Sequence, residues 1–190
     1  MNVTDLPSAF KKAREYGIGE YLELLGELSQ ESTKKGILDR KTKELITLGI
    51  ALAKGCHRCI SIHTEAARKM GAKGKALREV SKLVLFINAS PGCDSVDLWD
   101  EWRDSWKSFS SAKGPLERAH RELIALGIAL VRQQAPHIDL HTRAAIKHGA
   151  DANAVFEVVP IALLMDGAPV LSQIPCLVDA IDQAQNDKSA

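Results

Sequence analysis

The stretch ELITLGIALAKGCHRCISIHTEAARKMGA, residues 44–72, decides the fold, because the chain contains a second version of it. That version, ELIALGIALVRQQAPHIDLHTRAAIKHGA, occupies residues 122–150 and aligns with the first without a gap at a constant offset of 78 residues. About half of the aligned positions are identical. Identity at this level over an ungapped alignment indicates an internal duplication, in which each half is one structural unit.

The periodicity of apolar residues predicts the same helices in each unit. Residues 45–52 are dense in Leu and Ile, as in a helix buried on most sides, and Gly55 is placed to end it. A second helix is expected from near Cys56 to Gly71, and a third from about residue 75 to residue 87. No segment alternates apolar and polar residues over the length of a strand, so the predicted fold class is all-α.

The duplication predicts the domain organisation. We expect a single all-helical domain over residues 1–190, with a first repeat at 36–91 that carries the CxxC pair and a second, cysteine-free repeat at 115–171. Residues 92–114 are expected to form a connector helix between the repeats. This helix carries three tryptophans on one face, which we interpret as packing residues: Trp99, Trp102 and Trp106.

Composition excludes several classes of function. The 25 Lys and Arg residues balance 24 Asp and Glu residues, so no charge surplus is available to bind nucleic acid or an anionic membrane. The longest apolar runs are about half the length of a membrane span. Residues 1–32 predict one or two amphipathic helices and lack the pattern of a secretory signal, so we expect a cytoplasmic protein.

The CxxC pair and two nearby polar residues form the candidate catalytic group. Cys56 and Cys59 lie one helical turn apart at the start of a predicted helix, where the helix dipole and two basic neighbours favour a thiolate. His63 follows Cys59 by one turn and can accept its proton. Glu44 stands in an otherwise apolar helix and needs a partner, for which a histidine is suitable. The pattern predicts a relay from glutamate to histidine to cysteine.

Other interpretations of these residues stay open. The cysteine pair could be two inert core thiols, or it could bind a metal together with the histidine and the glutamate. In the second repeat, Glu122, His137 and His141 could form a metal site, although we expect Glu122 to pair with His141 as a buried remnant that supports packing. The remaining cysteines, Cys93 and Cys176, are expected to be small buried apolar residues.

The arrangement resembles a known family. A glutamate at residue 44, then eleven residues, then CHRC, then three residues and His63 is similar to the alkyl hydroperoxidase D and carboxymuconolactone decarboxylase family. The resemblance covers residues 36–91 and, without the cysteines, residues 117–169. It implies an all-helical fold, a homo-oligomer built through helical faces, and peroxide reduction by the two cysteines with the glutamate and the distal histidine as proton relay.

Two differences from the family pattern limit what is carried over. Peroxidase members have histidine directly before the second cysteine, whereas this chain has Arg58 there and His57 one place earlier, so no role is assigned to His57. The second repeat has Gln134 and His137 where the cysteines of the first repeat stand, so thiol chemistry is expected in the first repeat alone.

The function expected on this basis is a thiol-dependent peroxidase whose catalytic residues are Glu44, Cys56, Cys59 and His63. Cys59 is assigned the attack on the peroxide because it shares a helical face with His63, and Cys56 the resolution, although the reverse is open. The expected partners are a hydroperoxide and a reducing thiol protein or small-molecule thiol, with no cofactor, nucleic acid or membrane. Alternatives are a thiol-disulfide reductase or redox sensor, a carboxymuconolactone decarboxylase-like enzyme, a metal-binding helical protein, and an assembly protein whose cysteine pair sets its oligomeric state.

Overall fold

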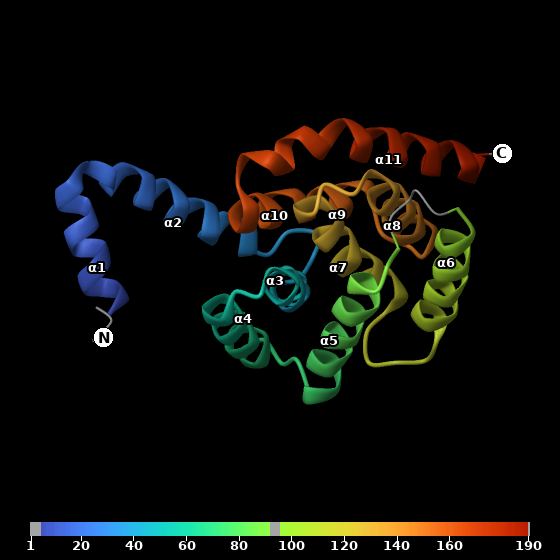
Figure 1. Cartoon of the computed structure of the whole chain (residues 1–190), viewed down its shortest axis with the longest axis horizontal. Helices are drawn as coiled ribbons and strands as arrows, with labels where there is room; N and C mark the ends of the chain where they lie inside the picture. Colours follow the sequence, from blue (N-terminus) through green and yellow to red (C-terminus); the bar gives the residue numbers. More distant parts are fainter. Residues whose placement is uncertain (1–4, 92–95, 190) are drawn as a thin grey trace.

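A computed structural model describes residues 5–91 and 96–189, and every regular element in these ranges is a helix (Figure 1). The all-α prediction is confirmed. None of these helices combines the length and the hydropathy that a membrane span requires. The α-helices are α1 Leu6–Ala13, α2 Gly19–Thr33, α3 Arg40–Lys54, α4 His57–Lys69, α5 Gly74–Asn88, α6 Val96–Ser111, α7 Arg118–Val131, α8 Ala135–Lys147, α9 Ala152–Phe156, α10 Val158–Asp166 and α11 Ile174–Ser189. A π-helical turn, η1 (Arg14–Ile18), joins α1 to α2, and a 3-10 helix, η2 (Ala168–Gln173), precedes α11.

Local sequence explains where α3 begins and ends. The Asp39 carboxylate accepts a hydrogen bond from the backbone N–H of Thr42 at 2.7 Å, which satisfies one of the free donors at the helix start. At the other end, Gly55 adopts φ 67°, a left-handed conformation that glycine reaches without a steric penalty. The predicted stop at Gly55 therefore has its expected physical cause.

The two halves meet where α3 crosses α7. Each helix has a glycine at the crossing, Gly49 in α3 and Gly127 in α7, and these positions are related by the repeat offset. A Cβ atom at residue 49 would lie 2.7 Å from Cγ2 of Ile124, and one at residue 127 would lie 3.0 Å from Cγ2 of Ile46. A methyl group at either position would force the facing isoleucine to shift, because the isoleucines pack directly against the opposing backbone.

A pair of reciprocal ion pairs ties the repeats together next to this crossing. Arg121 of the second repeat pairs with Glu79 of the first at 2.5 Å, and Lys43 of the first pairs with Glu157 of the second at 3.1 Å. Both interactions use corresponding positions of the two repeats. The side chains of the basic partners are 4% and 5% exposed, so the charges are largely removed from water and depend on each other.

Backbone groups complete these ion pairs. Glu157 accepts hydrogen bonds from the N–H groups of Ile37 and Leu38, at 2.7 and 3.0 Å, and Glu79 accepts one from the N–H of Leu116 at 3.3 Å. Partial burial opposes ionisation of Glu157, but the two N–H groups and the Lys43 ammonium hold the pKa of its carboxyl below the ordinary value. The segment that enters the central helix of each repeat is thus fixed by a carboxylate of the other repeat.

One hydrophobic core runs through both repeats, and the tryptophans of α6 belong to it. Trp102 and Trp106 are buried, and the ring of Phe86 from α5 packs on both at centroid distances of 5.8 and 5.6 Å. The Trp102 indole N–H donates to the carbonyl of Phe86 at 3.1 Å. The interpretation of these tryptophans as packing residues is therefore confirmed.

Two expectations about the outer cysteines have different outcomes. Cys93 lies outside the described residues, as does the start of the predicted connector at residues 92–95. Cys176, in α11, packs against the core but is only half-buried, so its prediction as a buried apolar residue holds in part. Its thiol lies 3.6 Å from the carbonyl of Ala135, at the edge between α11 and the start of α8.

The close crossing of α3 and α7 yields a stability prediction. Gly49→Ala places a methyl group against Ile124, whereas Gly26→Ala in α2 places one where nothing lies within 4 Å. Both changes remove a glycine from a helix interior and gain the same helix propensity. We therefore expect Gly49→Ala to have a free energy of unfolding about 1–3 kcal/mol below that of Gly26→Ala, measured by urea denaturation. Equal stabilities would show that the crossing tolerates the extra methyl.

Candidate functional site

The cysteine pair lies at the first turn of α4. Cys56 is the residue that caps this helix, and its sulfur accepts a hydrogen bond from the backbone N–H of Cys59 at 3.3 Å. A disulfide joins Cys56 to Cys59, whose Cα atoms are 5.3 Å apart. The left-handed turn at Gly55 directs the chain from α3 into α4 and places the sulfur of Cys56 at the positive end of the helix dipole. This position stabilises a thiolate when the disulfide is reduced.

Glu44 and His63 form a hydrogen-bonded pair beneath the cysteines. His63 Nδ1 lies 2.8 Å from Glu44 Oε2, and their side chains are 14% and 8% exposed. A carboxylate at Nδ1 holds the proton on that nitrogen and leaves Nε2, on the opposite edge of the ring, as the acceptor. The predicted pairing of Glu44 with His63 is present, and it supplies an oriented base one helical turn from Cys59.

The thiol site is open to solvent on one side. Both cysteines are half-buried, and Ala67 is the one residue of α4 that is buried. Within the described part of the chain, no hydrogen bond joins His63 to either sulfur. His57 and Arg58, the two residues between the cysteines, are exposed. The four predicted site residues are therefore brought together as two pairs, the disulfide and the Glu44–His63 hydrogen bond.

The second repeat contains a corresponding but longer polar chain. His141 Nδ1 lies 2.8 Å from Glu122 Oε2, which matches the Glu44–His63 distance in the first repeat. His141 Nε2 then lies 3.3 Å from Nδ1 of His137, and His137 Nε2 lies 2.8 Å from Oγ of Ser90. The indole N–H of Trp106 donates to both oxygens of Glu122 at 3.1 and 3.2 Å. The expected pairing of Glu122 with His141 is present, and both side chains are buried.

This geometry argues against a metal centre in the second repeat. Each ring nitrogen of His137 and His141 already faces a protein partner, so no lone pair is directed at a shared point. Burial, with the nearby His141 and Arg132, lowers the pKa of His137 to about 3, so its ring is neutral at physiological pH. In the parts of the chain that the structure describes, no cluster of three or more His, Cys, Asp or Glu side chains could hold a metal ion.

Sequence reasoning missed two members of this polar chain, Ser90 and Trp106. Both come from outside the repeated helix pair: Ser90 follows α5, and Trp106 lies in α6. The one available signal was the buried carboxylate of Glu122, which needs more than one donor, and an indole N–H is a suitable second donor. Spacing along the chain gave no indication of which tryptophan supplies it.

A cavity of about 720 Å³ lies in the second repeat between α6, α7, α8 and α11. Trp106 and Glu122 contribute to its wall, and the charged groups around it are of both signs. No residue of the thiol site lines it. The cavity is therefore separate from the CxxC pair, and we assign the candidate chemistry to the thiol site on the basis of its reactive groups.

Comparison with known proteins gives a family match and two uncharacterized relatives. The sequence profile of the carboxymuconolactone decarboxylase family matches residues 19–101 and, a second time, residues 96–174. The chain is 34% identical over 65 residues to the uncharacterized protein YdfG of Bacillus subtilis (strain 168), which covers 34% of this chain and 40% of that protein. It is 34% identical over 61 residues to the uncharacterized protein H16_B0147 of Cupriavidus necator, which covers 32% of this chain and 54% of that protein. The matches thus span about half of these relatives or less, and no solved structure matches the chain.

The two profile matches follow the duplication. The first extends from α2 into α6 and the second from α6 to the start of α11, so together they cover most of the chain. The second match begins at residue 96 and therefore includes α6, the helix that sequence analysis treats as a connector. The suspected resemblance is confirmed, and the chain belongs to the carboxymuconolactone decarboxylase family as two tandem family units.

Proposed function

We propose that the protein is a thiol-dependent peroxidase that cycles Cys56 and Cys59 between dithiol and disulfide. The observation that carries the proposal is the Glu44–His63 hydrogen bond of 2.8 Å, which orients the imidazole of His63 one helical turn from Cys59, near the start of α4. A histidine held by a carboxylate is a general base, and a CxxC pair supplies both a nucleophile and a resolving thiol. No further cofactor is needed for this chemistry.

The reaction has two steps. His63 accepts the proton of Cys59, and the thiolate attacks one oxygen of the hydroperoxide. The O–O bond breaks, an S–O bond forms, and the leaving alkoxide takes a proton from His63 to become an alcohol. Cys56 then attacks the sulfur of the sulfenic acid, the S–S bond forms, and hydroxide leaves with the proton of Cys56 as water. The peroxide is reduced by two electrons, which come from the two thiols.

The local geometry suits this division of roles. Cys59 lies nearest to His63 along the helix and receives help with its proton. The sulfur of Cys56, bonded to the N–H of Cys59, is stabilised as a thiolate, which favours it as the resolving nucleophile and as the leaving group when the disulfide is reduced. A thiol protein or a small-molecule thiol returns two electrons and two protons to close the cycle.

The proposal predicts which thiols react. After reduction, one equivalent of hydroperoxide should rapidly remove two thiols and form the Cys56–Cys59 disulfide, leaving Cys93 and Cys176 reduced. For Cys176, burial and the carboxylates of Asp139 and Asp179 raise the pKa of the thiol and lower its thiolate fraction. Thiol titration, intact mass and peptide mapping provide the measurement. A main disulfide that contains Cys93 or Cys176 would refute the CxxC mechanism. Slow loss of the thiols, with a midpoint potential near that of the cell, would favour a redox sensor.

The relay predicts the effect of removing its members. Glu44→Gln and His63→Ala should each slow peroxide-driven thiol oxidation by about 100-fold or more, because general-base assistance to Cys59 is lost. Stopped-flow thiol oxidation measures the rate, and far-ultraviolet circular dichroism checks that the helices remain. If the two residues act as a unit, the double variant is as slow as either single variant. Parent rates in both single variants would exclude the relay.

The second repeat supplies a matched control. Glu122→Gln changes the corresponding carboxylate, which is 1% exposed and accepts hydrogen bonds from Trp106 and His141. Loss of a carboxylate acceptor at this buried position should lower the free energy of unfolding by about 1–3 kcal/mol. The rate of thiol oxidation, measured well below the melting temperature, should stay at the parent value. A folded Glu122→Gln protein with unreactive thiols would mean that the second repeat takes part in the thiol chemistry.

A further inference from the structure

The two repeats differ in how their second helix is covered. In the second repeat, α8 lies beneath α6 and α11 and buries six residues: His137, Ile138, His141, Thr142, Ala145 and Ile146. In the first repeat, α4 packs mainly on α3 and buries Ala67 alone. Large apolar side chains remain in solvent here, with Ile62 of α4 52% exposed and Met70, directly after the helix, 40% exposed. The helix that carries the thiols thus lacks the cover that its counterpart has.

The covering helices recur along the chain at the repeat interval. α2, α6 and α11 start about 78 residues apart and place apolar residues at corresponding positions. α6 uses these positions against α8, where the rings of Trp99 and Trp102 each lie 4.8 Å from the ring of His137. α11 also packs on α8, and its residues at the corresponding positions are buried. The three sets are Tyr21, Leu24 and Leu28 in α2, Trp99, Trp102 and Trp106 in α6, and Leu177, Ala180 and Ala184 in α11.

The corresponding face of α2 is largely uncovered by the residues that the structure describes, although Leu28, toward the end of the helix that packs against α10, is half-buried. Tyr21 is 66% exposed and Leu24 is 61% exposed, and the neighbouring Leu25 is 52% exposed. Figure 1 shows α1 and α2 as an arm that extends away from the helical body. Phe10 of α1 and Tyr16 of η1 add to the exposed apolar surface of this arm, at 44% and 77%.

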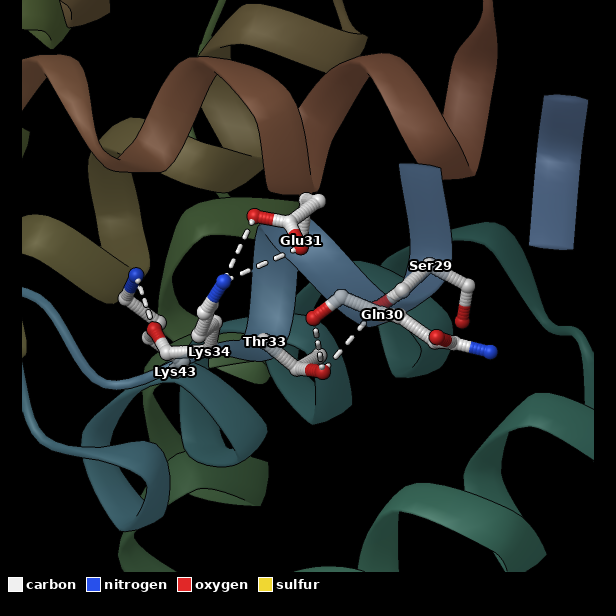
Figure 2. Close-up of polar contacts among 6 residues, drawn as sticks. All are labelled: Ser29, Gln30, Glu31, Thr33, Lys34 and Lys43. Atoms are coloured by element: carbon white, nitrogen blue, oxygen red, sulfur yellow. Dashed lines mark hydrogen bonds and ion pairs between the residues drawn. The ribbon is translucent and has the colours of Figure 1, made fainter. Parts of the chain in front are cut away.

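The base of the arm is fixed on the side of α3 that faces α10. Figure 2 shows the end of α2, where the Thr33 hydroxyl donates to the carbonyl of Ser29 at 2.9 Å and the Lys43 ammonium donates to the carbonyl of Lys34 at 2.7 Å. Lys43 also pairs with Glu157, and α2 packs against α10. These contacts hold α2 on the α10 side of α3, whereas the thiols lie on α4.

The charges of α2 and α4 are complementary. α2 contains four glutamates and no lysine or arginine: Glu20, Glu23, Glu27 and Glu31. α4 contains two arginines and a lysine against one glutamate: Arg58, Arg68, Lys69 and Glu65. Glu20, Glu27, Arg58 and Arg68 have no ion-pair partner among the residues that the structure describes. An acidic helix with an exposed apolar face therefore matches a basic helix that lacks its cover.

We propose that α2 of one copy docks on α4 of a second copy and covers its thiol site. By the register of α6 on α8, Tyr21 and Leu24 of one copy lie against Cys59 of the other, because Cys59 occupies the position of His137. The docked surfaces differ, so the contact closes either as a pair with two exchanged arms or as a ring. This inference goes beyond the peroxidase proposal and does not depend on it.

A disulfide trap tests the register of the contact. In a Cys56→Ser background, Leu24→Cys places a new thiol where it should reach the free Cys59 of a second copy. Mild oxidation of a mixture of isotope-labelled and unlabelled chains should give a crosslinked peptide that joins residue 24 of one chain to residue 59 of the other. The matched control is Leu85→Cys, at a leucine of α5 that is 67% exposed. A bond between residues 24 and 59 of the same chain, or a yield no higher than the control, would overturn the proposal.

Charge reversal tests the same contact without chemistry at the thiols. Glu20→Arg with Glu27→Arg, and separately Arg58→Glu with Arg68→Glu, should each raise the dissociation constant of the oligomer by about tenfold or more. The four changes together should recover much of the parent affinity. Lys82→Glu, on an exposed position of α5, should have no effect. Sedimentation velocity over a concentration series gives the measurement. A monomeric parent protein, or reversals with no effect, would contradict α2 docking on α4.

Discussion

The structure depends on the close crossing of α3 and α7, where Gly49 and Gly127 let isoleucine side chains of one helix reach the backbone of the other. The crossing relates the two repeats, and the reciprocal ion pairs Lys43–Glu157 and Arg121–Glu79 tie each repeat to the other beside it. Neither repeat can complete its own set of buried partners. The duplicated halves therefore form one core, and the α3 helix that carries Glu44 is held rigidly from both sides.

Both repeats contain a carboxylate–imidazole pair, but the surroundings of the two pairs differ. In both repeats a glutamate of the central helix meets a histidine of the next helix at 2.8 Å. In the first, the free edge of the imidazole lies one turn from a half-buried cysteine pair. In the second, His137 and Ser90 occupy that edge, and Trp106 closes the other side of the carboxylate. A polar pair that is satisfied on every side stabilises the fold, whereas one with an open edge is available for proton transfer.

The features that depend on local residue spacing could be predicted from the sequence. The gapless repeat predicted the helices and their order, and the buried Glu44 and Glu122 each required the histidine partner that the structure gives them. The sequence was insufficient where a partner comes from a distant segment. Ser90 and the Trp106 N–H reach the second polar chain from elements outside the repeated pair, and Cys176 is half-buried because the start of α11 lies beside the start of α8. Such contacts are set by packing between elements, which no local pattern encodes.

Because the chain is duplicated, comparison with α8 shows which helix contacts α4 lacks in the first repeat. The two repeats share their central crossing and their glutamate–histidine pair. The difference in burial between α4 and α8 therefore comes from the helices that surround them and not from the repeated helix pair. α8 has α6 and α11 on its surface, while α2, which has the same register, is anchored at its end and leaves Tyr21 and Leu24 of its apolar face in solvent. Exposed apolar surface of this extent on a helix with one sign of charge is costly in a monomer and favours association. Burying it on α4 would remove water from the thiols and strengthen the electrostatic effect of Glu44 and His63 on them.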